Sequence, residues 1–298
     1  MVKTKINSDK FFVIRTPRMS VKTLFSLVPD KKSTQELIDS WISRKEVIEA
    51  LYLASPSLVR RIEHWRKKPM SKQGKKVEQA LLKYLIRMTT RPTPFGLFSG
   101  ICTGSFDEET HLTIKSLRYD ERFTRIDISY LNGVKEYLKK SQPVSDNLIY
   151  RPNPSHYYVG SQCRYIESYQ SNSGLQYRLS AIESNDYFDY VMELAKNGAS
   201  FSILIKKFIL KYQGASKDDT ESFVKQLIDE SIIIADIPIP LTGDSPDIAL
   251  LKAVNKIGAR NVSVSLAKTI NGLKKLDQKN IADISDYKNV FSHLKIFL

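Results

Sequence analysis

The chain has 298 residues, of which 42% are hydrophobic and 10% aromatic, a composition typical of globular proteins with one large or two ordinary domains. Its formal net charge at pH 7 is +14, and so basic a surface attracts polyanions. No apolar run approaches the roughly 20 residues that cross a bilayer, and the N-terminus lacks the pattern of a signal peptide, so we expect a cytoplasmic protein.

The cysteines and histidines indicate neither a disulfide framework nor a metal site. Cys102 and Cys163 belong to no CxxC pair, and the four histidines share no ligand spacing. The sequence also contains no phosphate-binding glycine loop and no serine nucleophile elbow. We therefore expect no metal and no bound cofactor.

Residues 1–150 are predicted to form a mixed α and β domain. The apolar residues from Phe11 to Ile14 indicate a strand, and polar helices are expected over 33–43 and 44–54. Ser55 and Pro56 then have the pattern of a helix start, with Ser55 as N-cap and Pro56 at the first helical position.

The next segment is strongly basic. Between Arg60 and Arg91 lie 11 Lys and Arg against Glu63 and Glu78, a local net charge of 11 − 2 = +9. This cluster favours a phosphate or nucleic-acid partner. The alternative is that these side chains only form a solvated helix face, as lysines and arginines often do.

One helix in this segment is predicted to carry a basic stripe. Its apolar residues recur at the spacing of one helix face, which places Lys76, Lys83 and Arg87 on the opposite face. These three side chains and Arg91 are our candidates for contacts to an anionic partner.

Residues 87–100 read RMTTRPTPFGLFSG. Each proline disfavours helical geometry at the residue before it, so the helix should end near Thr90 and the chain should then run extended. Arg87, Arg91 and Thr93 would then converge on one anionic ligand. Alternatively, Pro-Thr-Pro is only a stiff connector.

After this turn, two strands over 97–106 and 111–116 are expected to pair, and a helix is expected from about Tyr130. Asp127 stands just before that helix. It could cap the N-terminus of the helix, or it could face the arginines as a carboxylate partner.

A second module is predicted over 151–240, after a linker marked by Pro152 and Pro154. Alternating segments at 164–168 and 176–180 indicate a β-hairpin, three helices follow, and a strand begins at Ser231. This β-β-α-α-α-β order is that of a winged-helix domain. Residues 241–298 are expected to be helical, so the fold class is α+β.

The third helix of this module argues against duplex DNA as its ligand. Residues 217–230 contain two lysines and five acidic residues, a local net charge of 2 − 5 = −3, which phosphates would repel. An extended peptide could instead add as a strand beside the hairpin. Its side chains would enter a groove lined by four candidates: Tyr177, Leu179, Val224 and Leu227. The alternative is that these four fill the module's core.

Taken together, the motifs resemble the N-terminal part of the class I lantibiotic (lanthipeptide) dehydratases. The similar segments follow in order along nearly the whole chain: FFVIRTP at 11–17, ALYLASPSL at 50–58, RMTTRPTPFGLFSG at 87–100, TRIDISYL at 124–131, RYIES at 164–168, LSAIE at 179–183 and PIPLTGDSP at 238–246. TRPTPFGLFSG is the most specific of them.

The resemblance implies an enzyme that takes glutamate from glutamyl-tRNA as co-substrate and esterifies Ser and Thr of a ribosomal precursor peptide, before a separate region eliminates glutamate. It implies that the winged-helix element recognises the leader peptide. It also implies that the positions linked to glutamylation fall on Arg87, Arg91, Thr93 and Asp127. Arg15 is a further candidate of lower rank.

This chain is much shorter than family members that carry the full activity, and we expect it to lack the elimination domain and to be inactive alone. A second chain would then supply the missing segments, and a lanthipeptide cyclase is a further partner that the resemblance suggests. Two other interpretations remain open: a stand-alone leader-peptide-binding component of a split enzyme, and a basic RNA-binding protein.

Overall fold

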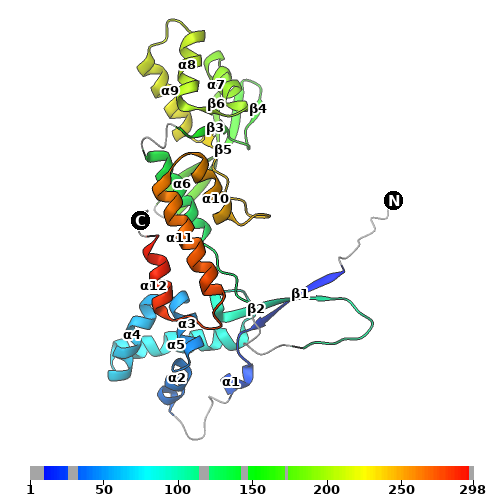
Figure 1. The fold of residues 1–298 in the computed structure, drawn as a ribbon, viewed down its shortest axis with the longest axis vertical. Helices are drawn as coiled ribbons and strands as arrows, with labels where there is room; N and C mark the ends of the chain where they lie inside the picture. Colours follow the sequence, from blue (N-terminus) through cyan, green and yellow to red (C-terminus); the bar gives the residue numbers. More distant parts are fainter. Residues whose placement is uncertain (1–9, 26–32, 114–120, 142–146, 172–173, 295–298) are drawn as a thin grey trace. The chain divides into compact units, whose positions relative to one another are not determined.

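The computed structural model describes residues 10–25, 33–113, 121–141, 147–171 and 174–294. Over these residues the fold is mixed α+β, with helices along most of the chain and three small antiparallel sheets (Figure 1). The chain forms two compact units, one of residues 1–123 and 275–289 and the other of residues 124–274 and 290–298. The functional domain boundaries expected at residues 150 and 240 stay a prediction.

The helices of the first unit begin where the sequence places their caps. They are α1 (Val21–Phe25), α2 (Thr34–Ile42), α3 (Lys45–Ala54), α4 (Pro56–Lys67) and α5 (Lys72–Thr90). Ser33 and Glu36 form a capping box at the start of α2, and the Ser55 side chain accepts from the backbone N–H of Leu58 at the start of α4, with Pro56 at its first position. The helices predicted over 33–43 and 44–54 and the cap of α4 are confirmed.

The apolar faces of these helices form the core of the first unit. Trp41, Leu51, Trp65, Leu81 and Leu85 are buried in it. The connection between α4 and α5 is tight, because a Cβ at Gly74 would lie 2.3 Å from the carbonyl oxygen of Lys68. Only glycine fits at this point of the chain without a backbone shift.

A two-stranded sheet completes the N-terminal part of this unit. β1 (Phe11–Pro17) pairs antiparallel with β2 (Ser99–Ser105), and the two lie side by side in Figure 1. The pairing expected between 97–106 and 111–116 is wrong for the described residues, since β2 pairs with β1 and residues 111–113 form no strand. Residues 114–116 lie outside the described part of the chain.

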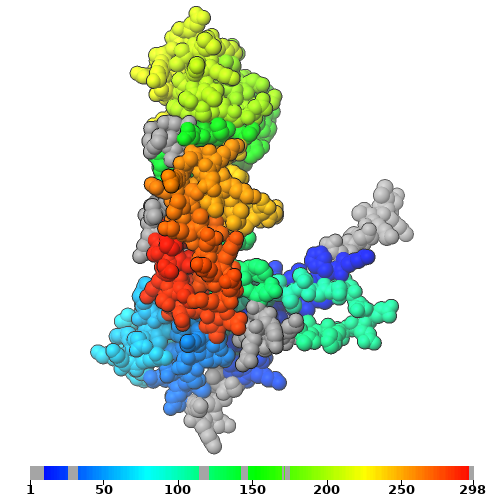
Figure 2. Space-filling view, in the orientation of Figure 1, coloured from blue at the N-terminus to red at the C-terminus, as the bar shows by residue number. Residues whose placement is uncertain are grey.

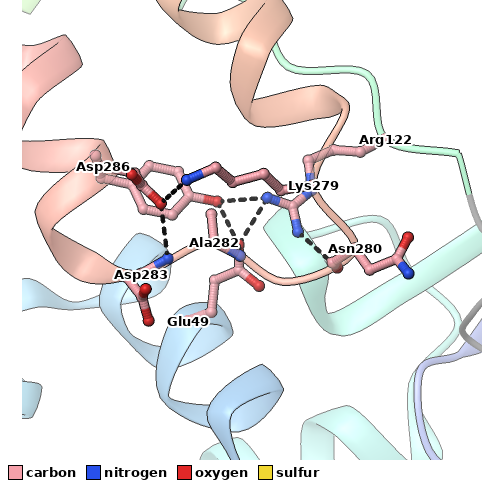
Figure 3. A network of polar contacts seen from close by, with 8 residues as sticks. Glu49, Arg122, Lys279, Asn280, Ala282, Asp283 and Asp286 are labelled. Atoms are coloured by element: carbon pink, nitrogen blue, oxygen red, sulfur yellow. Dashed lines mark hydrogen bonds and ion pairs between the residues drawn. The ribbon is translucent and has the colours of Figure 1, made fainter.

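Within the first unit, a buried polar network connects residues 275–289 to α3 (Figure 3). Glu49 on α3 is 2% exposed, and its Oε1 accepts from the Arg122 guanidinium (2.7 Å), the Tyr287 hydroxyl (2.7 Å) and the Ala282 backbone N–H (3.0 Å). Arg122 also donates to the Asn280 carbonyl (3.2 Å). Burial raises the pKa of Tyr287, and the hydrogen bond to Glu49 adds to the shift.

The second unit begins with a helix, followed by several strands and three further helices. In chain order they are α6 (Ile128–Lys140), β3 (Ile149–Pro152), β4 (Tyr157–Val159), β5 (Gln162–Ser171), β6 (Gly174–Glu183), α7 (Asp186–Lys196), β7 (Ala199–Ser200), α8 (Phe201–Lys211), α9 (Lys217–Asp229) and β8 (Ile233–Ala235). β5 and β6 form the predicted hairpin, with Ile166 opposite Leu179, and β4 pairs with the other edge of β5.

The closing strand β8 does not pair with this hairpin. It pairs with β3, which also pairs with β7, so a second small sheet has the order β7-β3-β8. Pro152, which we expected in a linker, is instead part of β3 and lies opposite Ile233. The predicted order of hairpin, three helices and strand is present, with three additional strands.

The segment after residue 241 is helical, as predicted. It contains α10 (Pro246–Lys256), α11 (Arg260–Asp277) and α12 (Ile284–Ser292). None of the helices in the described part of the chain is both long enough and apolar enough to cross a membrane.

Candidate functional site

The basic stripe lies on α5, which ends at Thr90 as predicted. Val77, Leu81 and Leu85 are buried on one face of this helix, and Lys76 and Lys83 are exposed on the other. The space-filling view shows the neighbouring basic helix α4, in light blue, at the surface of the first unit (Figure 2). The spacing of the apolar residues therefore predicted correctly which face of α5 is buried and which is exposed.

The last turn of α5 is closed by hydrogen bonds of its own residues. The hydroxyl of Thr89 donates to the Leu85 carbonyl (2.9 Å), the hydroxyl of Thr90 donates to the Ile86 carbonyl (2.7 Å), and the Arg91 N–H donates to the Arg87 carbonyl (3.1 Å). The Arg91 bond satisfies one of the carbonyl groups that a helix end otherwise leaves open, whereas the two threonine hydroxyls add second bonds to carbonyls within the helix. Arg91, the C-cap, has extended backbone geometry, as expected before Pro92.

The N-terminal strand runs directly into this region. Pro17 lies opposite Ser99, the Arg18 N–H donates to the Phe98 carbonyl (2.9 Å), and the Met19 N–H donates to the Met88 carbonyl (3.0 Å). Two motifs that are more than 60 residues apart in the sequence, FFVIRTP and RMTTRPTPFGLFSG, are therefore side by side in the first unit. Arg15 is exposed, opposite Ile101.

Arg87 and Arg91 have different surroundings. The guanidinium carbon of Arg87 lies 4.1 Å from the centroid of the Phe95 ring, and its Nε is buried with no hydrogen-bond acceptor among the described residues. Arg91 and Thr93 are exposed, and the Thr93 carbonyl accepts from the Ser99 hydroxyl (3.2 Å). The convergence of these three side chains on one ligand stays a prediction.

Asp127 lies in the second unit, at the N-terminus of α6. Its carboxylate accepts from the hydroxyl and from the backbone N–H (2.8 Å) of Ser129, and the hydroxyl is the main reason that the pKa of Asp127 is lowered. The cap is therefore formed. The second possibility, that Asp127 acts as a carboxylate partner in the site, stays a prediction.

The four candidates for peptide binding divide into two pairs. Tyr177 and Leu179 on β6 are 65% and 59% exposed, and β6 is an edge strand of the sheet β4-β5-β6. Val224 and Leu227 on α9 are buried, which agrees with the alternative that they fill the core of this module. Val224 and Leu227 therefore do not contact a bound peptide directly in our proposal. They support the surface of the module from inside its core.

Several residues at these places were not singled out from the sequence. Phe95 forms the contact with Arg87, and Ile166 and Leu175 extend the exposed apolar face of Tyr177 and Leu179. The alternation in β5 and β6 could have indicated Ile166 and Leu175, because residues opposite each other or two apart share a face. Nothing in the spacing of Phe95 distinguishes it from a core residue.

The decisive comparison is with protein families. The family described as "Lantibiotic dehydratase, N terminus" matches residues 43–295. The chain belongs to the lantibiotic dehydratase family. Two curated proteins, the epidermin biosynthesis protein EpiB and the subtilin biosynthesis protein SpaB, are similar to it. EpiB of Staphylococcus epidermidis is 24% identical over 248 residues (83% of this chain, 25% of EpiB), and SpaB of Bacillus subtilis is 27% identical over 197 residues (65% and 18%).

Solved structures show the same fold. The tRNA-dependent lantibiotic dehydratase MibB of Microbispora sp. 107891 matches with a TM-score of 0.71 and 19% identity, over 97% of this chain and 27% of MibB. The glutamylation domain of TbtB, from thiomuracin biosynthesis, matches with a TM-score of 0.52 and 14% identity, over 88% of this chain and 31% of that chain. The chain thus spans about a quarter of the length of the curated and structural relatives.

Proposed function

We propose that this dehydratase homologue binds glutamyl-tRNA through the end of α5 and a precursor peptide through the β5–β6 hairpin. In this way it supports the transfer of glutamate to Ser and Thr hydroxyls. The observation that carries the proposal is the family match over residues 43–295. Within the matched region, the exposed side chains of Lys76, Lys83 and Arg91 supply a surface suited to RNA. The edge strand β6 supplies a surface suited to an extended peptide.

The transfer itself is an ester exchange. A Ser or Thr hydroxyl of the peptide attacks the glutamyl carbonyl carbon, the bond to the terminal ribose oxygen of the tRNA breaks, and that oxygen takes the proton. The chain needs to bind two anionic parts, the RNA backbone and the glutamyl carboxylate. Guanidinium groups suit both, because their planar fork matches carboxylate and phosphate oxygens.

The residues would share these tasks as follows. Lys76 and Lys83 contact RNA phosphates, Arg87 and Arg91 neutralise phosphates of the acceptor end or the glutamyl carboxylate, and Thr93 orients the ester by a hydrogen bond. Asp127 holds the glutamyl ammonium group. We assign no general base.

The peptide half of the proposal rests on the free edge of β6. An extended leader peptide would add there as a further strand, with apolar side chains against Tyr177 and Leu179. The module would then act as a winged-helix-type recognition element, in which the hairpin is the wing. The acidic helix α9 disfavours duplex DNA as its ligand.

The RNA half is tested by the affinity of the 298-residue chain for glutamyl-tRNA. We expect Lys76→Gln with Lys83→Gln to weaken binding uniformly and to reduce the slope of log K against log salt by roughly 2, about one for each phosphate contact. The matched control is Lys206→Gln with Lys207→Gln, which removes two exposed lysines from α8. Equal losses in both double variants would mean that only net charge matters.

The peptide half is tested by titrating a lantibiotic precursor peptide that retains its leader against the same protein. Tyr177→Ser with Leu179→Ser should weaken binding about tenfold or more, because two exposed apolar contacts are lost. Leu210→Ser, at an even more exposed leucine on α8 (76%), is the control and should bind as the wild type does. Unchanged affinity of the double variant would refute peptide binding at this face.

A split-enzyme component that only captures the leader peptide is the second candidate. Its support is the exposed apolar face of β6, which requires no residue of α5. It predicts the same peptide binding with no preference for tRNA over duplex DNA, so the two assays together separate it from the first candidate.

A further inference from the structure

Among the residues that the structure describes, the Arg87 guanidinium contacts an aromatic ring and forms no ion pair. Its carbon lies 4.1 Å from the centroid of the Phe95 ring, within the range of cation–π contact. No carboxylate or carbonyl of the described residues accepts a hydrogen bond from this guanidinium, and its Nε is buried. A partly buried cation without an anionic partner is costly unless a ligand supplies one.

The stacking leaves the donor groups of Arg87 available. A ring over the face of a guanidinium occupies that face, whereas the N–H groups point outward in its plane. Because Nε is already buried, the terminal nitrogens are the donors that an external ligand could reach. They form the fork that binds carboxylate or phosphate oxygens in pairs.

The Phe95 ring is 38% exposed, and a buried aromatic side chain supports it. It packs against Phe98 with ring centroids 5.7 Å apart, and Phe98 is fully buried and packs against Tyr84 of α5 (5.4 Å). The backbone around it is constrained too, since Pro94 precedes it and Gly96 follows with φ +51°, a value that favours glycine. The Phe98 N–H donates to the Phe95 carbonyl (3.0 Å).

We propose that Phe95 is a positioning residue that fixes the plane of the Arg87 guanidinium so that its terminal N–H groups receive an oxyanion of the glutamyl-tRNA. The oxyanion is either a phosphate of the acceptor end or the glutamyl side-chain carboxylate. This inference rests on the proposed function, and it adds the residue that orients the binding arginine.

The test is a double-mutant cycle on the full chain with Phe95→Leu, Arg87→Lys and the combination of the two. Binding is measured to uncharged tRNA and to tRNA carrying glutamate through a non-hydrolysable amide. Phe95→Leu should weaken binding of the charged tRNA about 3- to 10-fold, the scale of a cation–π contact. In the Arg87→Lys background it should have little further effect, because lysine lacks the planar fork.

Two control variants distinguish a role of Phe95 in positioning Arg87 from a general effect of the substitution on folding. Phe95→Tyr retains the ring and should bind as the wild type does, and Phe123→Leu makes the same change at a side chain that is 87% exposed. Equal weakening with charged and uncharged tRNA would assign the oxyanion to RNA phosphate, whereas weakening with charged tRNA alone would assign it to the carboxylate.

The outcomes that overturn the inference differ from those that overturn the function. If the wild type binds tRNA and Phe95→Leu binds equally well, Phe95 does not position Arg87, while the proposed function stands. If the two substitutions act additively, the ring contacts the ligand independently of Arg87, and the inference is wrong. If the wild type does not bind tRNA, both the function and the inference are refuted.

Discussion

At the residue scale, Asp127 has a structural role that is present and a functional role that stays a prediction. Its carboxylate caps α6 through Ser129, and this local role is complete without any ligand. The sequence predicted the cap because Asp directly precedes the helical pattern. It could not separate capping from ligand binding, since both roles select a carboxylate.

Asp127→Asn separates the two roles. Asparagine caps helices about as well as aspartate, so we expect the free energy of unfolding at pH 7 to change by less than about 0.5 kcal/mol. If the carboxylate holds the glutamyl ammonium group, the preference for glutamyl-tRNA over uncharged tRNA should be lost in this variant. A retained preference would leave Asp127 as a cap only.

The lowered pKa of Asp127 gives this variant a pH signature. A carboxyl group whose pKa is lower in the folded protein adds stability above its unfolded-state pKa, and this stability is lost as the pH falls through the folded pKa. Urea unfolding of the wild type between pH 7 and pH 3 should therefore include this loss. The Asp127→Asn variant should lack it.

At the scale of elements, local signals were sufficient where an element is determined by its own residues. The cap at Ser55 and Pro56, the end of α5 at Thr90 and the β5–β6 hairpin all follow from short patterns, and all are present. Pairings between distant segments were not predictable in this way. The pairs β1–β2 and β3–β8 join residues about 80 to 95 apart, and the pattern of a strand does not identify its partner.

In the candidate site, too, local features were predictable from the sequence, whereas contacts made by the folded chain were not. The basic face of α5 followed from helical period, whereas the contact of Arg87 with Phe95 depends on how the Pro-Thr-Pro segment turns back after the helix. The burial of Val224 and Leu227 also became clear only when α9 was placed in its unit. An apolar residue on an amphipathic helix can line a core or a groove, and spacing alone fits both.

Glu49 provides a test of how residues 275–289 are attached to α3. Glu49→Ala leaves the Arg122 guanidinium, which is only 10% exposed, without its carboxylate, and should lower the free energy of unfolding by about 3–5 kcal/mol. Glu63→Ala removes an exposed partner of Arg66 and should cost at most about 1 kcal/mol.

Urea denaturation measures both values, and amide hydrogen exchange at Ala282 reports the local release of the segment. A similar cost for the two variants would show that the Glu49 network does not stabilise the fold as its burial indicates.

At the scale of the whole molecule, the family match and the two units define what the chain can contribute. Its fold is that of the N-terminal region of lantibiotic dehydratases, and it spans about a quarter of the length of its relatives. The first unit carries the basic helix and the arginines, and the second carries the strand edge proposed to bind the peptide, together with Asp127. Each proposed ligand thus has its main surface within one unit.

The affinity of the 298-residue chain for glutamyl-tRNA, with and without Arg87→Ala and Arg91→Ala, tests this account most directly. We predict that the wild type prefers glutamyl-tRNA to duplex DNA of equal charge, and that the double variant loses this preference with at least a tenfold drop in affinity, since charged hydrogen bonds contribute about 1.5–3 kcal/mol each. Equal binding of tRNA and duplex DNA by the wild type, or unchanged binding by the double variant, would contradict it.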